Sequence, residues 1–463
     1  MLDKLNEKIE NYKKDIISST RKLIQIKSVE TEPEQNMPFG PDVNEALETA
    51  LNIAGILGLE TKNIDGYAGY AEIGEGKDML GILTHLDVVP EGDDWTFSPY
   101  GGEIKDGKIY GRGALDNKGP TIAVLYALKA ILDLNIDLDK KVRLIMGTDE
   151  ESGWEGLNYY GQNETLPDIG FSPDAYFPVI HAEKGVSVFN LYKKFNNIKK
   201  TSDQIKIISI KGGNAPNMVP DYCEAIIETS NVSALDELIE KEDYDLELVE
   251  ENGRLKIKSF GKSAHGSMPW EGINAISQLM VLLDKICKPE DDIDRFINWY
   301  QNHIGMEYYG ESIGCGFEDN VSGKLIFNIG MIDLDNDEVK ITVNIRYPVT
   351  YKIEEIFDSM KKELNKVNID LEESQHIGPL HVSKNDELVL KLMDVYKEIT
   401  GEDREPIAIG GGTYARALKK GVAFGPLFPD RPEVAHQKDE YILIDDLIKA
   451  TKIYANAIVK LAK

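Results

Sequence analysis

Apolar residues first recur at helical spacing and then gather into short runs. Leu5, Ile9, Ile16 and Leu23 alternate with lysine and glutamate, which predicts an amphipathic helix over about the first 26 residues. Residues 30–42 are rich in proline, glutamate and asparagine and predict a loop. A second helix is predicted at 43–57, ending near Gly58.

Three apolar runs, at 79–84, 142–146 and 176–180, predict buried strands. A helix is predicted between the first two, at 121–132. Strands that alternate with helices are typical of an α/β layer with a largely parallel sheet. The third run contains a proline, which favours a sheet edge or a strand end. Ligands of such sheets bind outside the carboxyl ends of the strands.

The pattern changes after about residue 185, where alternating strands and separate helices indicate an α+β region. The strands are predicted at 205–210, 224–229, 255–259 and 339–346, and the helices at 233–241, 272–286 and 353–366. Near residue 380 the first pattern returns, with helices at 385–399 and 445–462. We therefore predict an α/β catalytic domain with a mostly parallel sheet and flanking helices, made of 1–185 and 380–463. An α+β domain, 186–379, is inserted into it.

The composition fits a globular protein of two domains. The chain has 463 residues, of which 42% are hydrophobic, and a net charge of −28. Such an acidic surface repels phosphate backbones and anionic lipid heads. Neither nucleic acid nor a membrane is therefore an expected partner. Solubility is the ordinary explanation of such a charge and identifies no substrate.

Cysteine usage and the first residues favour the cytoplasm. Cys223, Cys287 and Cys315 lie far apart and form neither a disulfide framework nor a CxxC pair. The opening MLDKLNEKIENYKKD has no apolar core and is not expected to be a signal peptide. No run approaches the roughly 18 apolar residues of a membrane span.

Candidate metal ligands follow the predicted strands. His85 and Asp87, in THLDVVP, point to the same side of an extended chain, so Asp87 can fix the imidazole tautomer or act as a co-ligand. Asp116, in GRGALDNKGP, can bridge two cations or simply cap a helix. Each pattern alone is also compatible with a purely structural role.

Consecutive acids come directly after the second predicted strand, in TDEESGWEG. Glu150 and Glu151 repel each other unless a cation lies nearby, and with one present one glutamate can ligate while the other acts as a general base. A solvated acidic turn is the plain alternative. With Asp174 in SPDAYFP and His436 in RPEVAHQKDEY, the set mixes nitrogen and oxygen donors, which suits Zn²⁺, Mn²⁺ or Co²⁺ better than Ca²⁺.

In order along nearly the whole chain, HLDVVP, GRGALDNKGP, DEESG, SPD and a late histidine closely resemble the M20 family of metallopeptidases, and within it the dipeptidases. The resemblance implies two divalent ions per subunit, with zinc the first expectation and manganese or cobalt the alternatives. It implies that His85 and Asp174 hold one ion, Glu151 and His436 hold the other, and Asp116 bridges them. It also implies Glu150 as the base, Asp87 as the residue that orients His85, and a cis peptide bond after Asp116.

The inserted region resembles the lid domain of the same family. His265, in GKSAHGSMPWEG, is implied to stabilise the oxyanion. Strand alternation places Arg346 on the polar face of KITVNIRYP, and arginine can grip a carboxylate with two hydrogen bonds. GGNAPNMVPD offers Asn217 as a further substrate contact, with Asn214 as a less favoured alternative. The glycine-rich GGGTYARAL supplies backbone N–H groups, with Gly412 and Thr413 as the expected carboxylate cradle.

Three functions are compatible with these residues. The first is a dipeptidase for small peptides with a free C-terminal carboxylate, working as a monomer because the long lid resembles those that bring the histidine from the same chain. The second is a deacylase that removes acetate or succinate from an amino acid with the same metal ligands. The third is a metal or peptide binder without catalysis, which the intact set of ligands and base disfavours.

Overall fold

The computed structural model describes residues 2–197, 205–230, 232–251 and 254–463 and divides into two compact units. Unit 1 contains the chain up to Ala182, Leu380–Ala408 and Gly412–Lys463, and unit 2 contains Glu183–Pro379 and Ile409–Gly411. The boundaries predicted from the sequence are 185/186 and 379/380, and those of the two units are 182/183 and 379/380. The short stretch Ile409–Gly411, which the sequence placed with the ends of the chain, groups with unit 2.

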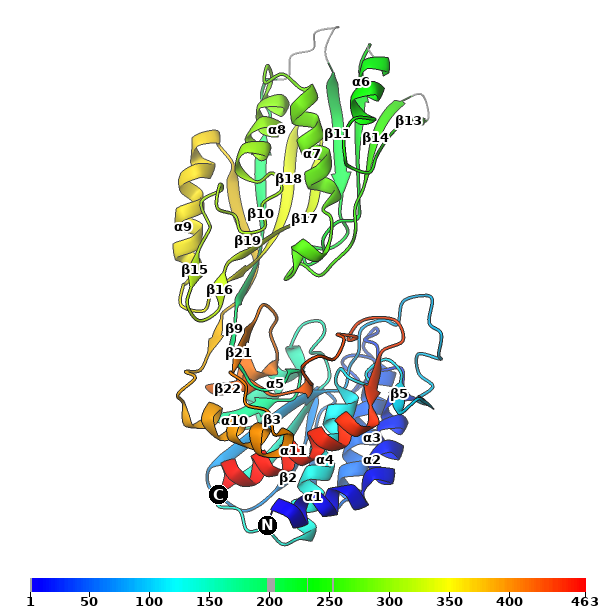
Figure 1. Ribbon diagram of the computed structural model, residues 1–463, viewed down its shortest axis with the longest axis vertical. Coiled ribbons are helices and arrows are strands. Elements are labelled where there is room, and N and C mark those ends of the chain that lie inside the picture. The colour runs from blue at the N-terminus through cyan, green and yellow to red at the C-terminus, as the bar shows by residue number, and fades with distance from the viewer. Residues whose placement is uncertain (1, 198–204, 231, 252–253) are drawn as a thin grey trace. The chain divides into compact units, whose positions relative to one another are not determined.

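Unit 1 is built on a nine-stranded sheet with a parallel centre (Figure 1). β3 pairs in parallel with β6 and β7, and β22 pairs in parallel with β7, whereas β1, β2 and β9 join antiparallel. In sheet order the strands are β1 (Glu60–Ile64), β2 (Ala68–Ile73), β6 (Lys141–Gly147), β3 (Met79–His85), β7 (Ile169–Ser172), β22 (Lys420–Ala423), β9 (Ile180–Glu183) and β20 (Leu380–His381), with β21 (Ile407–Ile409) beside β9.

Alternating side chains of the central strands pack on opposite faces of this sheet. Leu80 and Ile82 of β3 join the large core under α4 and α11, which lie side by side, while Leu83 faces a smaller cluster with Tyr414 (Figure 1). The helices of unit 1 are α1 (Leu2–Asn11), α2 (Lys13–Ile24), α3 (Pro41–Ile56), α4 (Lys118–Asp133), α5 (Glu155–Asn163), α10 (Glu387–Thr400) and α11 (Ile444–Ala462).

The single N-terminal helix expected from the sequence is two helices. Tyr12 interrupts it, and the apolar positions Leu5, Ile9, Ile16 and Leu23 are nevertheless all buried. The break lets α1 pack on α11 and α2 pack on α4 and α3. Periodicity alone could not reveal it, because the apolar spacing continues across both helices.

The strand predicted at 176–180 is wrong. The buried neighbour of β3 is β7, and the predicted segment is divided between the two-residue β8 (Ala175–Tyr176) and β9. Pro178 lies between them, preceded by a cis peptide bond, and proline has no N–H for a sheet ladder. The four residues of β7 include Gly170, so this strand is too short to give a clear apolar run.

Unit 2 is an antiparallel eight-stranded sheet with its own core. Its strands, in sheet order, are β13 (Leu246–Glu251), β14 (Arg254–Phe260), β12 (Tyr222–Glu228), β11 (Lys206–Gly212), β17 (Ile326–Leu334), β18 (Glu338–Tyr347), β10 (Gly185–Lys194) and β19 (Asp370–Ile377). Its helices are α6 (Val232–Ile239), α7 (Ala275–Ile286), α8 (Asp292–His303) and α9 (Ile353–Leu364). The expected α+β character is present, and β10, β13, β17, β19 and α8 are additional elements.

Short strands complete the described part of the chain. They are β4 (Glu103–Lys105), β5 (Lys108–Tyr110) and β24 (Tyr441–Leu443) in one small sheet, β8 with β23 (Pro426–Leu427), and β15 (Glu318–Asp319) with β16 (Gly323–Lys324). Within the described ranges, no helix combines the length and apolar character needed to cross a membrane.

Candidate metal centre

Candidate ligands meet at the carboxyl ends of three adjacent parallel strands. His85 is the last residue of β3, Glu150 and Glu151 follow the end of β6, and Asp174 follows β7. Parallel strands end at the same edge of a sheet, so residues far apart in sequence gather there. Asp116 and His436 reach this edge from the loops before α4 and β24.

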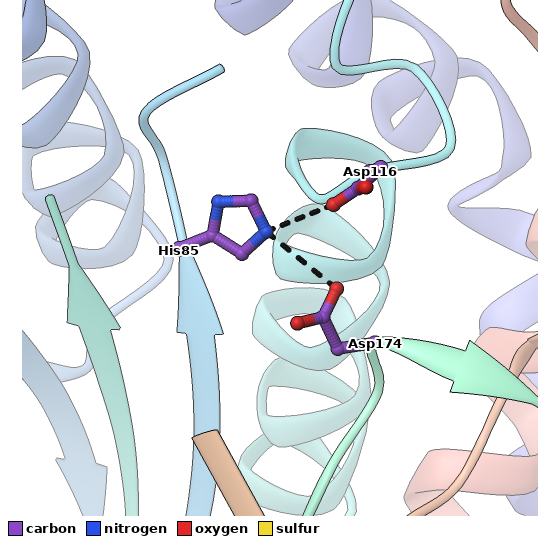
Figure 2. Close-up of side chains that lie close together, drawn as sticks. All are labelled: His85, Asp116 and Asp174. Atoms are coloured by element: carbon purple, nitrogen blue, oxygen red, sulfur yellow. Dashed lines mark hydrogen bonds and ion pairs between the residues drawn. The ribbon is translucent and has the colours of Figure 1, made fainter. Parts of the chain in front are cut away.

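Two groups of side chains could each hold a metal ion, and they share Asp116. In the first, His85 Nε2 lies 2.9 Å from Asp116 Oδ1 and 3.5 Å from Asp174 Oδ1 (Figure 2). In the second, His436 Nε2 lies 3.0 Å from Glu151 Oε1 and 3.1 Å from Asp116 Oδ2. Asp116 therefore turns one oxygen toward each group, which is the geometry of a bridging carboxylate.

The electrostatics of these residues fit a cation site. Burial, together with the charges of Asp174 and Glu151, raises the pKa of Glu150 well above its usual range. Burial also raises the pKa of Asp174 to about 7. Burial opposes a charge on His436, but hydrogen bonds to Asp116 and Glu151 outweigh it and raise its pKa to about 11. Acids this close together need bound protons or cations, and imidazole with carboxylate suits Zn²⁺, Mn²⁺ or Co²⁺.

Asp87 connects the two groups. The ring Nδ1 of His85 lies 3.0 Å from the backbone oxygen of Asp87 and 3.4 Å from its Oδ1. Since both atoms are acceptors, the proton of a neutral His85 lies on Nδ1, and Nε2 keeps its lone pair for a metal. The other oxygen of Asp87, Oδ2, accepts the backbone N–H of Glu151 at 3.0 Å.

The loop that carries Asp116 also steadies Asp174. The buried Asn117 donates through Nδ2 to Asp174 Oδ1 and to the Pro173 carbonyl, each at 2.7 Å. The Asp116–Asn117 peptide bond is cis, which confirms the expectation from the family resemblance.

The expected oxyanion and substrate residues His265, Asn217 and Arg346 belong to unit 2. The Asn217 and His265 loops are joined, because Gly266 N–H donates to Asn217 O at 2.7 Å and Met218 pairs with His265 as a β-bridge. The Nδ1 of His265 lies 2.6 Å from Ser267 Oγ and accepts the Ser267 N–H at 3.3 Å. Arg346 lies on β18 and is buried.

Gly412 and Thr413 belong to unit 1, with the candidate metal ligands. A Cβ at Gly412 would lie 2.6 Å from Arg416 Nε, so a larger residue there would displace the Arg416 guanidinium. Thr413 Oγ1 accepts the Ala415 N–H at 3.2 Å and caps the short helix that begins at Tyr414. The buried Tyr414 ring lies edge-on to His85, with 6.4 Å between ring centroids, so the glycine loop leads directly to a candidate ligand.

Four further residues that shape this site were not singled out from the sequence: Arg112, Asn117, Tyr414 and Glu440. The first three lie inside the motifs GRGALDNKGP and GGGTYARAL, so the motifs contained them but gave no reason to choose them. Glu440 lies in RPEVAHQKDEY, four residues after His436, but the chain has 80 Asp and Glu residues and no spacing distinguishes this one.

A parallel-centred α/β unit with imidazole and carboxylate donors around one shared carboxylate is typical of metal-dependent hydrolases. Residues 81–460 match the family model described as Peptidase family M20/M25/M40, and the chain belongs to that family.

Relatives and solved structures agree with this assignment. A Bacillus subtilis protein named "Putative dipeptidase YtjP" is 42% identical over 97% of this chain and 98% of its own length. Human carnosine dipeptidase 1 aligns over 100% of this chain and 98% of its own, at a TM-score of 0.61 and 17% identity. The Bacillus subtilis YXEP protein, titled a dinuclear metal binding peptidase of the M20 family, aligns over 98% and 99% of the two chains, at a TM-score of 0.52 and 12% identity. These solved structures share the fold.

Proposed function

We propose that this enzyme is a two-metal dipeptidase that hydrolyses dipeptides with a free C-terminal carboxylate. The observation that supports it most is the shared Asp116, whose two oxygens face one candidate ligand group each. His85 and Asp174 would hold one ion, Glu151 and His436 the other, with zinc the first choice and manganese or cobalt the alternatives. Bound ions of this kind act as Lewis acids toward the scissile carbonyl.

Glu150 is the proposed general base. It belongs to neither ligand group, although its neighbour Glu151 belongs to one. Its raised pKa, caused mainly by burial, suits a carboxylate that takes a proton from the attacking water and delivers it to the leaving nitrogen. Asp87 would act through His85, by keeping the proton on Nδ1.

His265 is the proposed donor to the oxyanion. Its Nδ1 accepts the Ser267 N–H, so a neutral ring carries its proton on Nε2 and can donate from there. Arg346, Asn217 and the backbone of Gly412 and Thr413 would bind the substrate carboxylate. With the carbonyl and the carboxylate both fixed, one residue fits between them, which selects dipeptides.

We further propose that the enzyme is a cytoplasmic monomer. All three cysteines are free, as in a reducing compartment. The length of unit 2, Glu183–Pro379, supports a lid that delivers His265 to the site of its own chain.

The test is a hydrolysis panel of dipeptides, C-terminally amidated dipeptides, tripeptides, and N-acetyl and N-succinyl amino acids. We expect dipeptides to be cut much faster than all the others. Chelation should abolish the activity, and Zn²⁺, Mn²⁺ or Co²⁺ should restore it. Faster release of acetate or succinate would establish a deacylase instead, and equal cleavage of amidated dipeptides would refute the carboxylate contact.

A further inference from the structure

The carboxylate of Glu440 fills a loop of backbone N–H groups around the shared ligand Asp116. Its Oε1 accepts the N–H groups of Leu115 and Asp116 at 2.9 and 3.1 Å. Its Oε2 accepts the Gly113 N–H at 3.1 Å and Arg112 Nη1 at 2.8 Å. Successive N–H groups that converge in this way form an anion-binding nest, and here the protein supplies the anion itself.

Arg112 extends this contact to two more segments. Its guanidinium, buried like Glu440, donates to the Gln437 carbonyl at 3.3 Å and to the Pro90 and Glu91 carbonyls at 3.4 and 3.3 Å. The Arg112–Glu440 pair therefore joins the chain after Asp87, the Asp116 loop and the chain after His436. Each of these segments carries or supports a candidate ligand.

The second ligand group depends on Glu440 from two sides. Glu440 fixes the backbone N–H of Asp116, and it lies four residues after His436, with its own carbonyl accepting the Gly111 N–H at 2.8 Å. Both Asp116 and His436 belong to the second group, which has three members. Of these two residues, only Asp116 belongs to the first group. A displaced Glu440 thus disturbs the second group more than the first.

We propose that Glu440, with Arg112, is a positioning residue that orients Asp116 as the bridging ligand and sets the affinity of the Glu151–His436 metal site. This inference rests on the proposed two-metal function and adds a residue that touches neither metal nor substrate. The glutamine side chain of Glu440→Gln has nearly the same shape, but it has one acceptor oxygen and one NH₂ group in place of two acceptor oxygens. At least one pair of donors therefore loses its acceptor.

The experiment titrates the metal-free protein with Co²⁺, follows its visible absorption, and records the melting temperature of the metal-free form. We expect wild-type protein to bind two ions and Glu440→Gln to bind one of them about 10- to 100-fold more weakly, the usual effect of losing a partner that orients a ligand. The other ion should bind nearly as in wild type. Arg112→Lys keeps the charge, loses the planar fork, and should show a smaller loss at the same site.

Glu72→Gln is the matched control. Glu72 and Arg143 form another buried carboxylate–guanidinium pair in unit 1, with Oε2 and Nε 2.7 Å apart, on the sheet strands β2 and β6. This variant should bind both ions as wild type does. Wild-type affinities in both Glu440→Gln and Arg112→Lys, or an equal loss in Glu72→Gln, would overturn the inference. A wild-type protein that binds fewer than two ions would overturn the two-metal function on which it rests.

Discussion

Units 1 and 2 differ in how they arrange their buried ionisable groups. Unit 1 gathers imidazoles and carboxylates around the candidate metal centre, whereas most buried polar side chains of unit 2 are amides and hydroxyls, beside the buried Glu183, Lys184, Asp291 and Arg346. Thr342 Oγ1 donates to Asn190 Oδ1 at 2.8 Å, and Asn328 Nδ2 donates to the Met218 carbonyl at 2.9 Å. The contrast is between His85, Asp87, Arg112, Lys118, Asp149 and Glu440 in unit 1 and Asn190, Gln278, Asn328, Thr342 and Asn344 in unit 2.

Burying a charge costs far more than burying a hydrogen-bonded amide, so the two units do different work. The acids and imidazoles that meet at the ends of β3, β6 and β7 need protons or cations beside them, which points to chemistry there. Buried polar groups of unit 2 support loops. Asn328, for example, donates to the Pro216 and Met218 carbonyls on either side of Asn217, a proposed substrate contact, which points to recognition. Substitutions in either unit, mixing of inactive variants and removal of metal can each test this difference.

The largest effect is expected in unit 1, at the proposed base. Glu150→Ala should lower kcat by about 10²- to 10⁴-fold, the usual contribution of a general base, and keep its metal. Glu151→Ala should instead lose metal, since its carboxylate belongs to a ligand group. Metal analysis beside steady-state kinetics separates the two, and equal metal contents in both variants would refute the assigned roles.

The next effect belongs to unit 2. His265→Ala should lower kcat by about 10²- to 10³-fold, as the loss of one oxyanion donor does, without changing metal content. His303→Ala is the control, because this imidazole lies on α8 with Nδ1 3.0 Å from the Trp299 carbonyl. A loss of metal in His265→Ala would show that unit 2 contributes to the metal site and would break the comparison.

The same variant tests the subunit state. Mixing inactive His265→Ala with inactive Glu150→Ala protein should restore no activity if each chain completes its own site. Substantial recovery would show that His265 serves a partner chain.

A smaller effect is expected at the substrate carboxylate. Arg346→Ala should lower kcat/KM for a dipeptide about 10- to 150-fold, since a hydrogen bond to a charged group contributes ~1.5–3 kcal/mol. The preference over the amidated dipeptide should nearly disappear. Lys340→Ala, an exposed position on the same face of β18, should leave both values unchanged. An Arg346→Ala enzyme that still prefers the free acid would place carboxylate recognition elsewhere.

The smallest effect concerns stability and pH in the metal-free protein. Asp174, with its pKa raised to about 7, and His436, with its pKa raised to about 11, hold protons in the folded state that the unfolded chain releases. Their stabilisation is therefore complete at low pH and falls as pH rises, from about 4 for Asp174 and from about 6.5 for His436.

Metal ions replace these protons, and an ion at 100 times its Kd stabilises the fold by about 2.7 kcal/mol. The melting temperature lost on chelation should consequently be larger at pH 8 than at pH 5.5. Hydrogen exchange should locate the loss in β3 and β6 rather than in β17 and β18. An equal loss at both pH values would contradict the proton-holding role of Asp174 and His436.

The long apolar strands explain how much of the candidate site could be predicted. β3 and β6 are mostly apolar, although Arg143 interrupts the run in β6, and each strand leads directly into a motif with His85 or Glu150, so strand and chemistry reinforce each other. β7 has four residues and left no such signal, although Asp174 follows it. Glu440 and Asn117 act through contacts between segments distant in sequence, and no local pattern encodes those contacts.

The discontinuous build of unit 1 has a consequence for biosynthesis. About 350 residues separate His85 from His436, and β22 and α11 are also made after unit 2. At roughly 5–20 residues per second, a ribosome needs on the order of 20 to 70 s to pass from the first ligand to the last. Throughout that interval the Glu151–His436 site has no histidine and the parallel sheet lacks a strand. If His436 is the metal ligand that we propose, the nascent enzyme stays inactive while it is being made, and its peptidase chemistry begins only when the late segment folds back onto the first.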